Sequence, residues 1–216
     1  ENALIEYNLM YDMTDLLRQH DVNIDHLEPT AVDSIRDAFD GAIYGLPVNL
    51  NTLIFMYNKA IFDQFGVDYP EDGMTWEEMS ALASRLTRTE DRDYFGYGMN
   101  NPVFSWTFNS LSIPIVDVET NQPTINTDPR WRTMLQHVYL DPSITEAYQR
   151  IGKIPNWASF SVDQNVAMVL ATTGQITASP AELQTLDWDM VSVPVFSETP
   201  DVGPRASPVY FGITSL

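Results

Sequence analysis

An uninterrupted apolar run, Leu53–Met56, lies inside the segment 42–59. A Tyr-Gly-Leu-Pro turn opens this segment and a Tyr-Asn-Lys sequence closes it. A short run of β-branched and aromatic residues between turn signals predicts a buried strand. The next residues, Ala60–Phe65, follow a helical pattern that Gly66 ends. The chain is therefore expected to pass directly from a buried strand into a short helix.

Apolar residues at helical spacing recur along the rest of the chain. They predict helices over Met13–Arg18, Ala31–Phe39, Trp76–Arg88 and Ile144–Arg150, and a further helix that begins at Asp128-Pro129. Thr75 followed by Glu78 is the signature of a capping box at the start of the third of these helices. Strands are predicted over Tyr94–Met99 and Val191–Val195, and a β-hairpin over Ile113–Thr124. Trp76 and Trp131 fall on apolar helix faces and are interpreted as core residues rather than ligand contacts.

Charge narrows the possible partners. The chain of 216 residues has a formal net charge of −19. This balance argues against nucleic acid as a ligand, since a basic surface supplies most of the affinity for phosphate backbones. It also disfavours anionic ligands that are attracted over long range, and it is compatible with neutral solutes. An acidic surface that serves only solubility gives the same number, so the charge alone does not identify the ligand.

The chemistry of cofactor and metal sites is poorly represented. Without cysteine, the chain has no disulfides, no thiol catalysis and no cysteine-based zinc site. His20, His26 and His137 are scattered, with no spacing typical of a metal site, and are interpreted as surface or helix-end residues. We expect no cofactor. No window holds the ~18 apolar residues of a membrane span, and the opening Glu-Asn-Ala, without a signal peptide, is typical of a mature or truncated product.

The order of the motifs resembles a known family. A turn with Pro47, an apolar strand that ends in Tyr57-Asn58-Lys59, a short helix and a Thr75-Trp76-Glu77-Glu78 helix start follow one another. This order resembles the extracellular solute-binding proteins of bacterial ABC importers, in their sugar-binding, maltose-binding-protein-like group. The resemblance implies an α/β fold of the two-lobe, periplasmic-binding-protein type (type II), with this chain covering mostly the C-terminal lobe.

The resemblance also implies a division of the chain. Residues 1–52 would be a remnant of the first lobe that leads into a strand crossing between lobes. Residues 53–205 would form the second lobe, and 206–216 would return towards the first. Ser161–Leu170 resembles a helix of the family that packs on the sheet and delivers the loop Ala171–Gln175 to the ligand cleft.

Candidate ligand contacts come from two sources. The amides of Asn49 and Asn51 both donate and accept hydrogen bonds, as hydroxyl groups require, although asparagine is also common in turns before strands. The resemblance adds polar residues for the hydroxyls of a sugar and aromatic rings for its apolar face. For the two aromatic rings in the segment that follows Tyr94–Met99, core packing is the alternative. The residues that the resemblance adds are Asn101, Phe104, Trp106, Thr173, Gln175 and Tyr210.

We therefore expect a binding protein rather than an enzyme. No hydrolase, phosphate-loop, dinucleotide or zinc motif is present, and thirty acidic residues make any carboxylate pair uninformative. The expected function is to bind a neutral solute, a sugar or oligosaccharide, and to deliver it to the transmembrane subunits of an ABC permease. The protein would be an extracellular monomer, tethered by a lipid anchor or periplasmic. A carbohydrate-active enzyme and a sugar sensor for a signalling partner are the alternatives.

Overall fold

The computed structural model describes residues 6, 7 and 9–215, except for the side chain of Phe104. The chain divides into two compact units. Unit 1 comprises residues 1–51 and 206–216, and unit 2 comprises residues 52–205. The chain passes between them twice, after Asn51 and after Arg205.

Unit 1 is built on a two-stranded antiparallel ribbon of β1 and β9. The phenol of Tyr210, on β9, packs against a helix: it donates a hydrogen bond to the Ala31 carbonyl at 2.8 Å and lies 2.6 Å from the Ser34 hydroxyl. The predicted helices over 13–18 and 31–39 are confirmed within a residue or two. The elements of unit 1 are α2 (Thr14–Gln19), α3 (Pro29–Ala38), β1 (Leu46–Asn51) and β9 (Ser207–Phe211).

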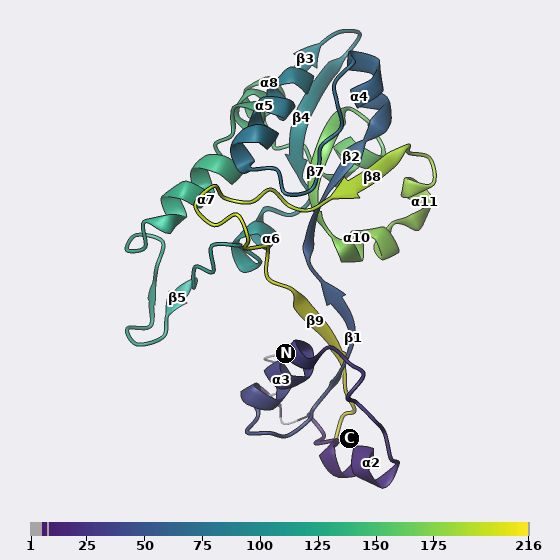
Figure 1. Ribbon diagram of the computed structural model, residues 1–216, viewed down its shortest axis with the longest axis vertical. Coiled ribbons are helices and arrows are strands. Elements are labelled where there is room, and N and C mark those ends of the chain that lie inside the picture. The colour runs from purple at the N-terminus through teal and green to yellow at the C-terminus, as the bar shows by residue number, and fades with distance from the viewer. Residues whose placement is uncertain (1–5, 8, 216) are drawn as a thin grey trace. The chain divides into compact units, whose positions relative to one another are not determined.

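Unit 2 contains a five-stranded sheet in the order β3-β4-β7-β2-β8 (Figure 1). β4 and β7 are parallel neighbours, and the other pairs are antiparallel. The sheet strands are β2 (Leu53–Asn58), β3 (Arg88–Thr89), β4 (Asp93–Met99), β7 (Val166–Thr172) and β8 (Trp188–Val191), and a separate hairpin joins β5 (Val116–Asp117) to β6 (Gln122–Pro123). The helices are α4 (Lys59–Phe65), α5 (Trp76–Leu86), α6 (Pro102–Thr107), α7 (Arg130–Val138), α8 (Pro142–Ile151), α9 (Trp157–Ser161), α10 (Thr173–Ala178) and α11 (Pro180–Leu183).

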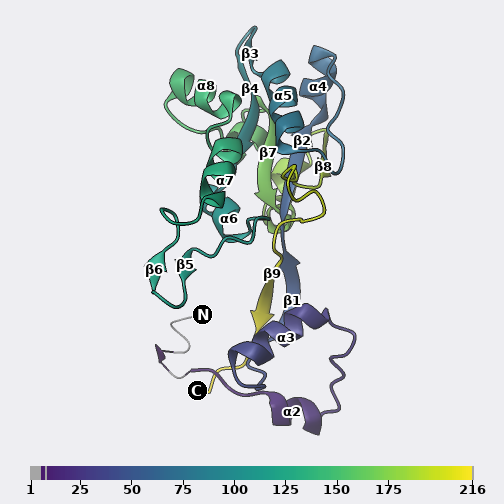
Figure 2. The ribbon, with the colours of Figure 1, turned by 60° about the vertical axis from the view of Figure 1, so that its left-hand side comes forward.

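Strand β2 is buried along its whole length because helices cover both faces of the sheet (Figure 2). Its side chains alternate between two hydrophobic clusters, as the two-residue period of a strand requires. Leu53, Phe55 and Tyr57 belong to the first core cluster, with side chains from α4, α5 and α7. Ile54 and Met56 belong to the second core cluster, with side chains from α9 and α11. This burial confirms the strand predicted from the apolar run.

Short-range capping chemistry also agrees with the sequence. The Thr75 hydroxyl accepts from the Glu78 N–H at 3.2 Å, and the Glu78 carboxylate accepts from the Thr75 N–H at 2.8 Å, so the capping box is confirmed. Asn58 caps α4 by accepting from the Ala60 N–H at 3.1 Å. Gly66 ends that helix in the left-handed region, with φ of 61°.

Trp76 and Trp131 lie in the first core cluster, each 3% exposed. This confirms their interpretation as core residues.

The helix expected over Ser161–Leu170 is wrong. α9 stops at Ser161, and the apolar run that follows forms β7, which is buried at every position. β7 lies between β4 and β2, so both of its faces and both of its edges are covered. A buried strand has no polar face and reads as a continuous apolar run, which its periodicity does not distinguish from a buried helix.

Two neighbouring expectations change with it. The segment Ala171–Gln175 is not a loop, since β7 continues to Thr172 and α10 begins at Thr173. The strand predicted over Val191–Val195 lies earlier, as β8, over Trp188–Val191.

Candidate functional site

One edge of the sheet in unit 2 collects several polar side chains. The parallel strands β4 and β7 end side by side there, with Met99 opposite Leu170. The antiparallel β2 begins at the same edge, with Leu53 opposite Thr172. Ligands of open α/β sheets bind outside the carboxyl ends of parallel strands. We call this group the polar edge: Thr52, Asn100, Asn101, Thr173 and Gln175.

Backbone hydrogen bonds hold the polar edge in place. The Asn100 N–H donates to the Leu170 carbonyl at 2.9 Å, and the Thr173 N–H donates to the Thr52 carbonyl at 3.0 Å. The Thr173 hydroxyl in turn accepts from the Thr52 N–H at 3.3 Å. The ends of the strands therefore present their side chains from a backbone that is fixed by the sheet itself.

A row of side-chain hydrogen bonds crosses from β4 to α10. Asn100 Nδ2 donates to Gln175 Oε1 at 2.7 Å, and Gln175 Nε2 donates to Ser179 Oγ at 2.9 Å. Asn100 escaped the sequence analysis, which selected only its neighbour Asn101. The sequence signal that could have identified Asn100 as a site residue is its position directly after a predicted strand. The row orients the two amides and so restricts their side-chain rotamers before any ligand binds.

Asn101 and Trp106 both belong to the α6 region. Asn101 Oδ1 accepts from the Val103 N–H at 3.0 Å, so its amide helps to start α6. Trp106 is 36% exposed, and its ring contacts Tyr139 edge-on at 6.1 Å between centroids. The side chain of Phe104 lies outside the described residues. Ligand contact by these three residues stays a prediction.

The Tyr139 phenol forms hydrogen bonds with the first turn of α6. The Ser105 hydroxyl donates to the Pro102 carbonyl at 2.7 Å, and the Tyr139 phenol is in short contact with both groups. Burial raises the pKa of Tyr139 to about 12, which keeps the phenol neutral and able to donate. The helix that follows Asn101 and carries Trp106 is thus attached to the end of α7.

The other three predicted contacts belong to unit 1. Asn49 is exposed and Asn51 is half-buried, both on β1. The Tyr210 phenol bonds to α3, as described above, which gives it a structural role within unit 1. For all three, contact with a ligand stays a prediction.

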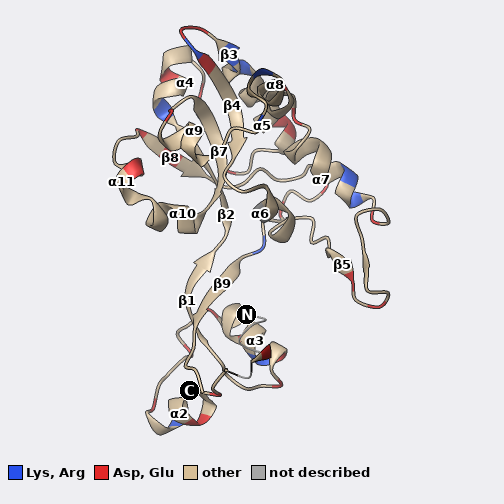
Figure 3. Cartoon of the chain, turned by 180° about the vertical axis from the view of Figure 1, so that it is seen from behind, with Lys and Arg blue, Asp and Glu red and all other residues tan. Residues whose placement is uncertain are grey.

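Formal charge is absent from the segments that build the polar edge. Residues 52–58, 94–116 and 164–181 include no Asp, Glu, Lys, Arg or His, in a chain with 30 acidic and 11 basic residues. Figure 3 shows α6, α10 and the adjoining strand ends without charged positions. Arg205 reaches the border of this region, where its N–H donates to the Phe108 carbonyl at 3.0 Å. The site therefore offers amides, hydroxyls and an aromatic ring, which suit a ligand that is neutral and rich in hydroxyl groups.

Two features are absent from the described part of the chain. No group of three or more His, Asp or Glu residues there is placed to hold a metal ion. None of the helices described is long and apolar enough to cross a bilayer.

Solved structures with a similar fold are solute-binding proteins. An ABC substrate-binding protein from Listeria monocytogenes, in complex with cycloalternan, is 21% identical with a TM-score of 0.72, over 98% of this chain and 53% of that one. UgpB from Mycobacterium tuberculosis, in complex with glycerophosphocholine, is 19% identical with a TM-score of 0.72, over 99% and 52%. The maltose/maltodextrin-binding domain MalE from Bdellovibrio bacteriovorus, bound to maltotriose, is 16% identical with a TM-score of 0.64, over 99% and 54%.

These likenesses show the fold, that of type II periplasmic binding proteins, as the resemblance implied. The chain spans about half the length of each of these structures. A search of curated proteins found no match. The profile of the family described as bacterial extracellular solute-binding protein matches residues 2–211, nearly the whole chain. The chain therefore belongs to the family of bacterial extracellular solute-binding proteins.

Proposed function

We propose that this chain forms most of the second lobe of an extracellular protein that binds a neutral, hydroxyl-rich solute. The solute is a sugar or oligosaccharide, and the loaded protein, a monomer, delivers it to an ABC permease. The observation that carries this proposal is the polar edge, which lies at the carboxyl ends of β4 and β7 and is built from segments without charge.

The absence of charge favours a neutral solute for an electrostatic reason. A charged solute that leaves water for a protein site needs an opposite charge or several donors to offset its lost hydration. The hydroxyls of a sugar need only groups that donate and accept, and amides do both. Relatives in complex with cycloalternan and with maltotriose support the same solute class.

We also propose that the solute is bound without being turned over. The family and the similar structures are binding proteins of ABC transporters. The amides and hydroxyls at the polar edge are poor general acids and bases, since they do not titrate near neutral pH.

A thermal-shift panel of neutral mono- and oligosaccharides, with sugar acids and sugar phosphates as charged counterparts, tests the proposal. A sugar at a hundred times its dissociation constant stabilises the native state by about 2.7 kcal/mol. In a chain of this size the midpoint of thermal unfolding would rise by roughly 5–10 °C. We expect a saturable rise with one neutral class and unchanged sugar by chromatography. Cleavage of the sugar, or a rise only with the charged counterparts, would contradict the proposal.

Removing the amide row is expected to weaken binding of the sugar identified in that panel. Asn100→Ala and Gln175→Ala should each raise its dissociation constant about tenfold, since a lost hydrogen bond with an unpaired partner costs about 1–3 kcal/mol. The double variant should lose less than the sum of the two, because the amides bond to each other. Isothermal titration calorimetry measures the dissociation constants of the two single variants and of the double variant.

Gln184→Ala serves as the matched control, because this exposed amide lies beyond α11 and outside the polar edge. It should leave the dissociation constant unchanged. Full affinity in both edge variants would show that the solute binds elsewhere.

A further inference from the structure

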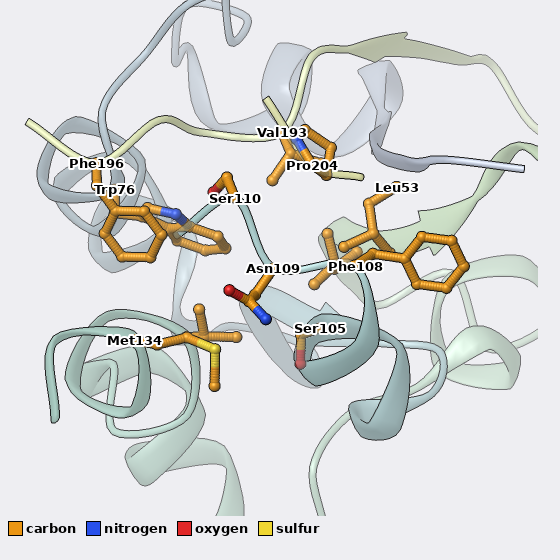
Figure 4. A pocket seen from close by; sticks show the side chains of 12 residues that line it. Leu53, Trp76, Ser105, Phe108, Asn109, Ser110, Met134, Val193, Phe196 and Pro204 are labelled. Carbon is orange, nitrogen blue, oxygen red and sulfur yellow. The ribbon is translucent and has the colours of Figure 1, made fainter. Parts of the chain in front are cut away.

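Unit 2 contains a small, partly open cavity of about 20 Å³, which Ser105 of α6 helps to line (Figure 4). Leu53 and Leu170, at the ends of β2 and β7, line it beneath the polar edge. Trp76 from α5 and Met134 from α7 contribute further walls. The cavity is far too small for a sugar, whose sites typically enclose ~300 Å³ or more.

One wall of the cavity carries a polar atom without a protein partner. Trp76 is 3% exposed, and its indole Nε1–H is buried with no hydrogen-bond acceptor among the described protein atoms. Trp131 is equally buried, but its Nε1–H donates to the Thr124 hydroxyl at 2.8 Å. Leaving a buried donor unpaired is unfavourable enough that nearly all such groups in native proteins have a protein or water partner. The unpaired indole N–H of Trp76 therefore indicates a bound hydrogen-bond acceptor that is not part of the protein.

Hydrogen-bonding groups for such a ligand line the same cavity. Asn109 Oδ1 accepts from the Ile113 N–H at 2.9 Å, and a carbonyl oxygen has a second lone pair. Ser110 is 8% exposed and brings a hydroxyl that can donate or accept. Figure 4 shows both side chains in the lining with the indole of Trp76.

We propose that this cavity is the binding site of a single structural water molecule. The water accepts a hydrogen bond from Trp76 Nε1–H and donates to Asn109 Oδ1 and Ser110 Oγ. A buried water needs about 10–15 Å³ of such volume and two to four polar partners, and the cavity provides both. The water ties the start of α5 to the chain just after α6, and so helps to hold the helix that follows Asn101 and carries Trp106.

A high-resolution crystal structure of the chain tests the site directly. We expect one well-ordered density peak about 2.8–3.1 Å from Trp76 Nε1. Ser110→Val should remove the peak. The methyl groups of the valine occupy part of the cavity, and the hydroxyl that would bind the water is lost. A featureless cavity in the unmodified chain would overturn the proposal.

Thermal stability gives an independent test in solution. In the Ser110→Val background no water is left to lose, so Trp76→Phe should lower the midpoint about 2–4 °C less than it does in the unmodified chain. Trp131→Phe is the matched control, since its indole bonds to Thr124 and its effect should be equal in both backgrounds. Equal effects of Trp76→Phe in the two backgrounds would overturn the proposed bridge.

Discussion

Gly96→Ala is expected to prevent unit 2 from folding stably. A Cβ atom at Gly96, on β4, would lie 1.9 Å from the Ala83 carbonyl oxygen and 2.5 Å from the Ala83 carbonyl carbon and Cα. These are backbone atoms of α5, so no side-chain rotation relieves the overlap. The helix would have to lift from the sheet and open the first core cluster, in which Ala83 is completely buried.

The cost should exceed about 4 kcal/mol, a large share of the 5–15 kcal/mol by which domains are stable. Urea unfolding followed by circular dichroism measures it, and we expect a collapsed midpoint or no cooperative transition. Gly203→Ala is the matched control, because a Cβ there meets no atom within 4 Å. A cooperative transition of Gly96→Ala within 1 kcal/mol of the parent chain would show that α5 does not rest on β4 as described.

Two neighbouring substitutions on β7 should each be nearly as severe. Met168 and Val169 are both completely buried, Met168 in the first core cluster and Val169 in the second. Asp at either position places a carboxylate in an apolar layer without a partner. A buried, unpaired charge costs about 3–5 kcal/mol, partly reduced if the carboxylate takes up a proton. We expect Met168→Asp and Val169→Asp to destabilise unit 2 by comparable amounts.

This pair tests whether β7 is buried on both of its faces. In a strand between two helical layers, neighbouring side chains point to opposite faces and both are buried. The urea midpoints of the two variants measure how much stability each substitution costs. Val162→Asp is the control, because Val162 is 66% exposed and should change stability by less than about 0.5 kcal/mol. Tolerance of Asp at either buried position would contradict the assignment of β7.

Local chemistry explains which predictions from the sequence succeeded. The capping box of Thr75 and Glu78 joins residues three apart, and the end of α4 at Gly66 depends on the backbone freedom of a single residue. Such features need no information from distant parts of the chain. The order of the motifs similarly identified the family, since it depends only on their sequence along the chain.

The error over Ser161–Leu170 has the opposite origin. Val166–Thr172 is apolar at nearly every position, and nothing within such a run says whether its backbone bonds to itself or to neighbouring strands. β4 and β2, which begin at residues 93 and 53, supply the partners. Pairing on both edges, not local propensity, made this segment a strand.

The sequence by itself determined the family, the caps, the two core tryptophans and the acidic, cysteine-free character of this protein, because each depends on residue type or on neighbours close along the chain. Only the tertiary structure decided that β7 is the centre of the sheet and that Asn100 meets Gln175, its partner on α10. It also decided that the indole of Trp76 faces a cavity, whereas that of Trp131 meets a hydroxyl. The physical reason is that strand pairing, side-chain hydrogen bonds and cavities join residues far apart in the chain, and only the folded backbone brings these together.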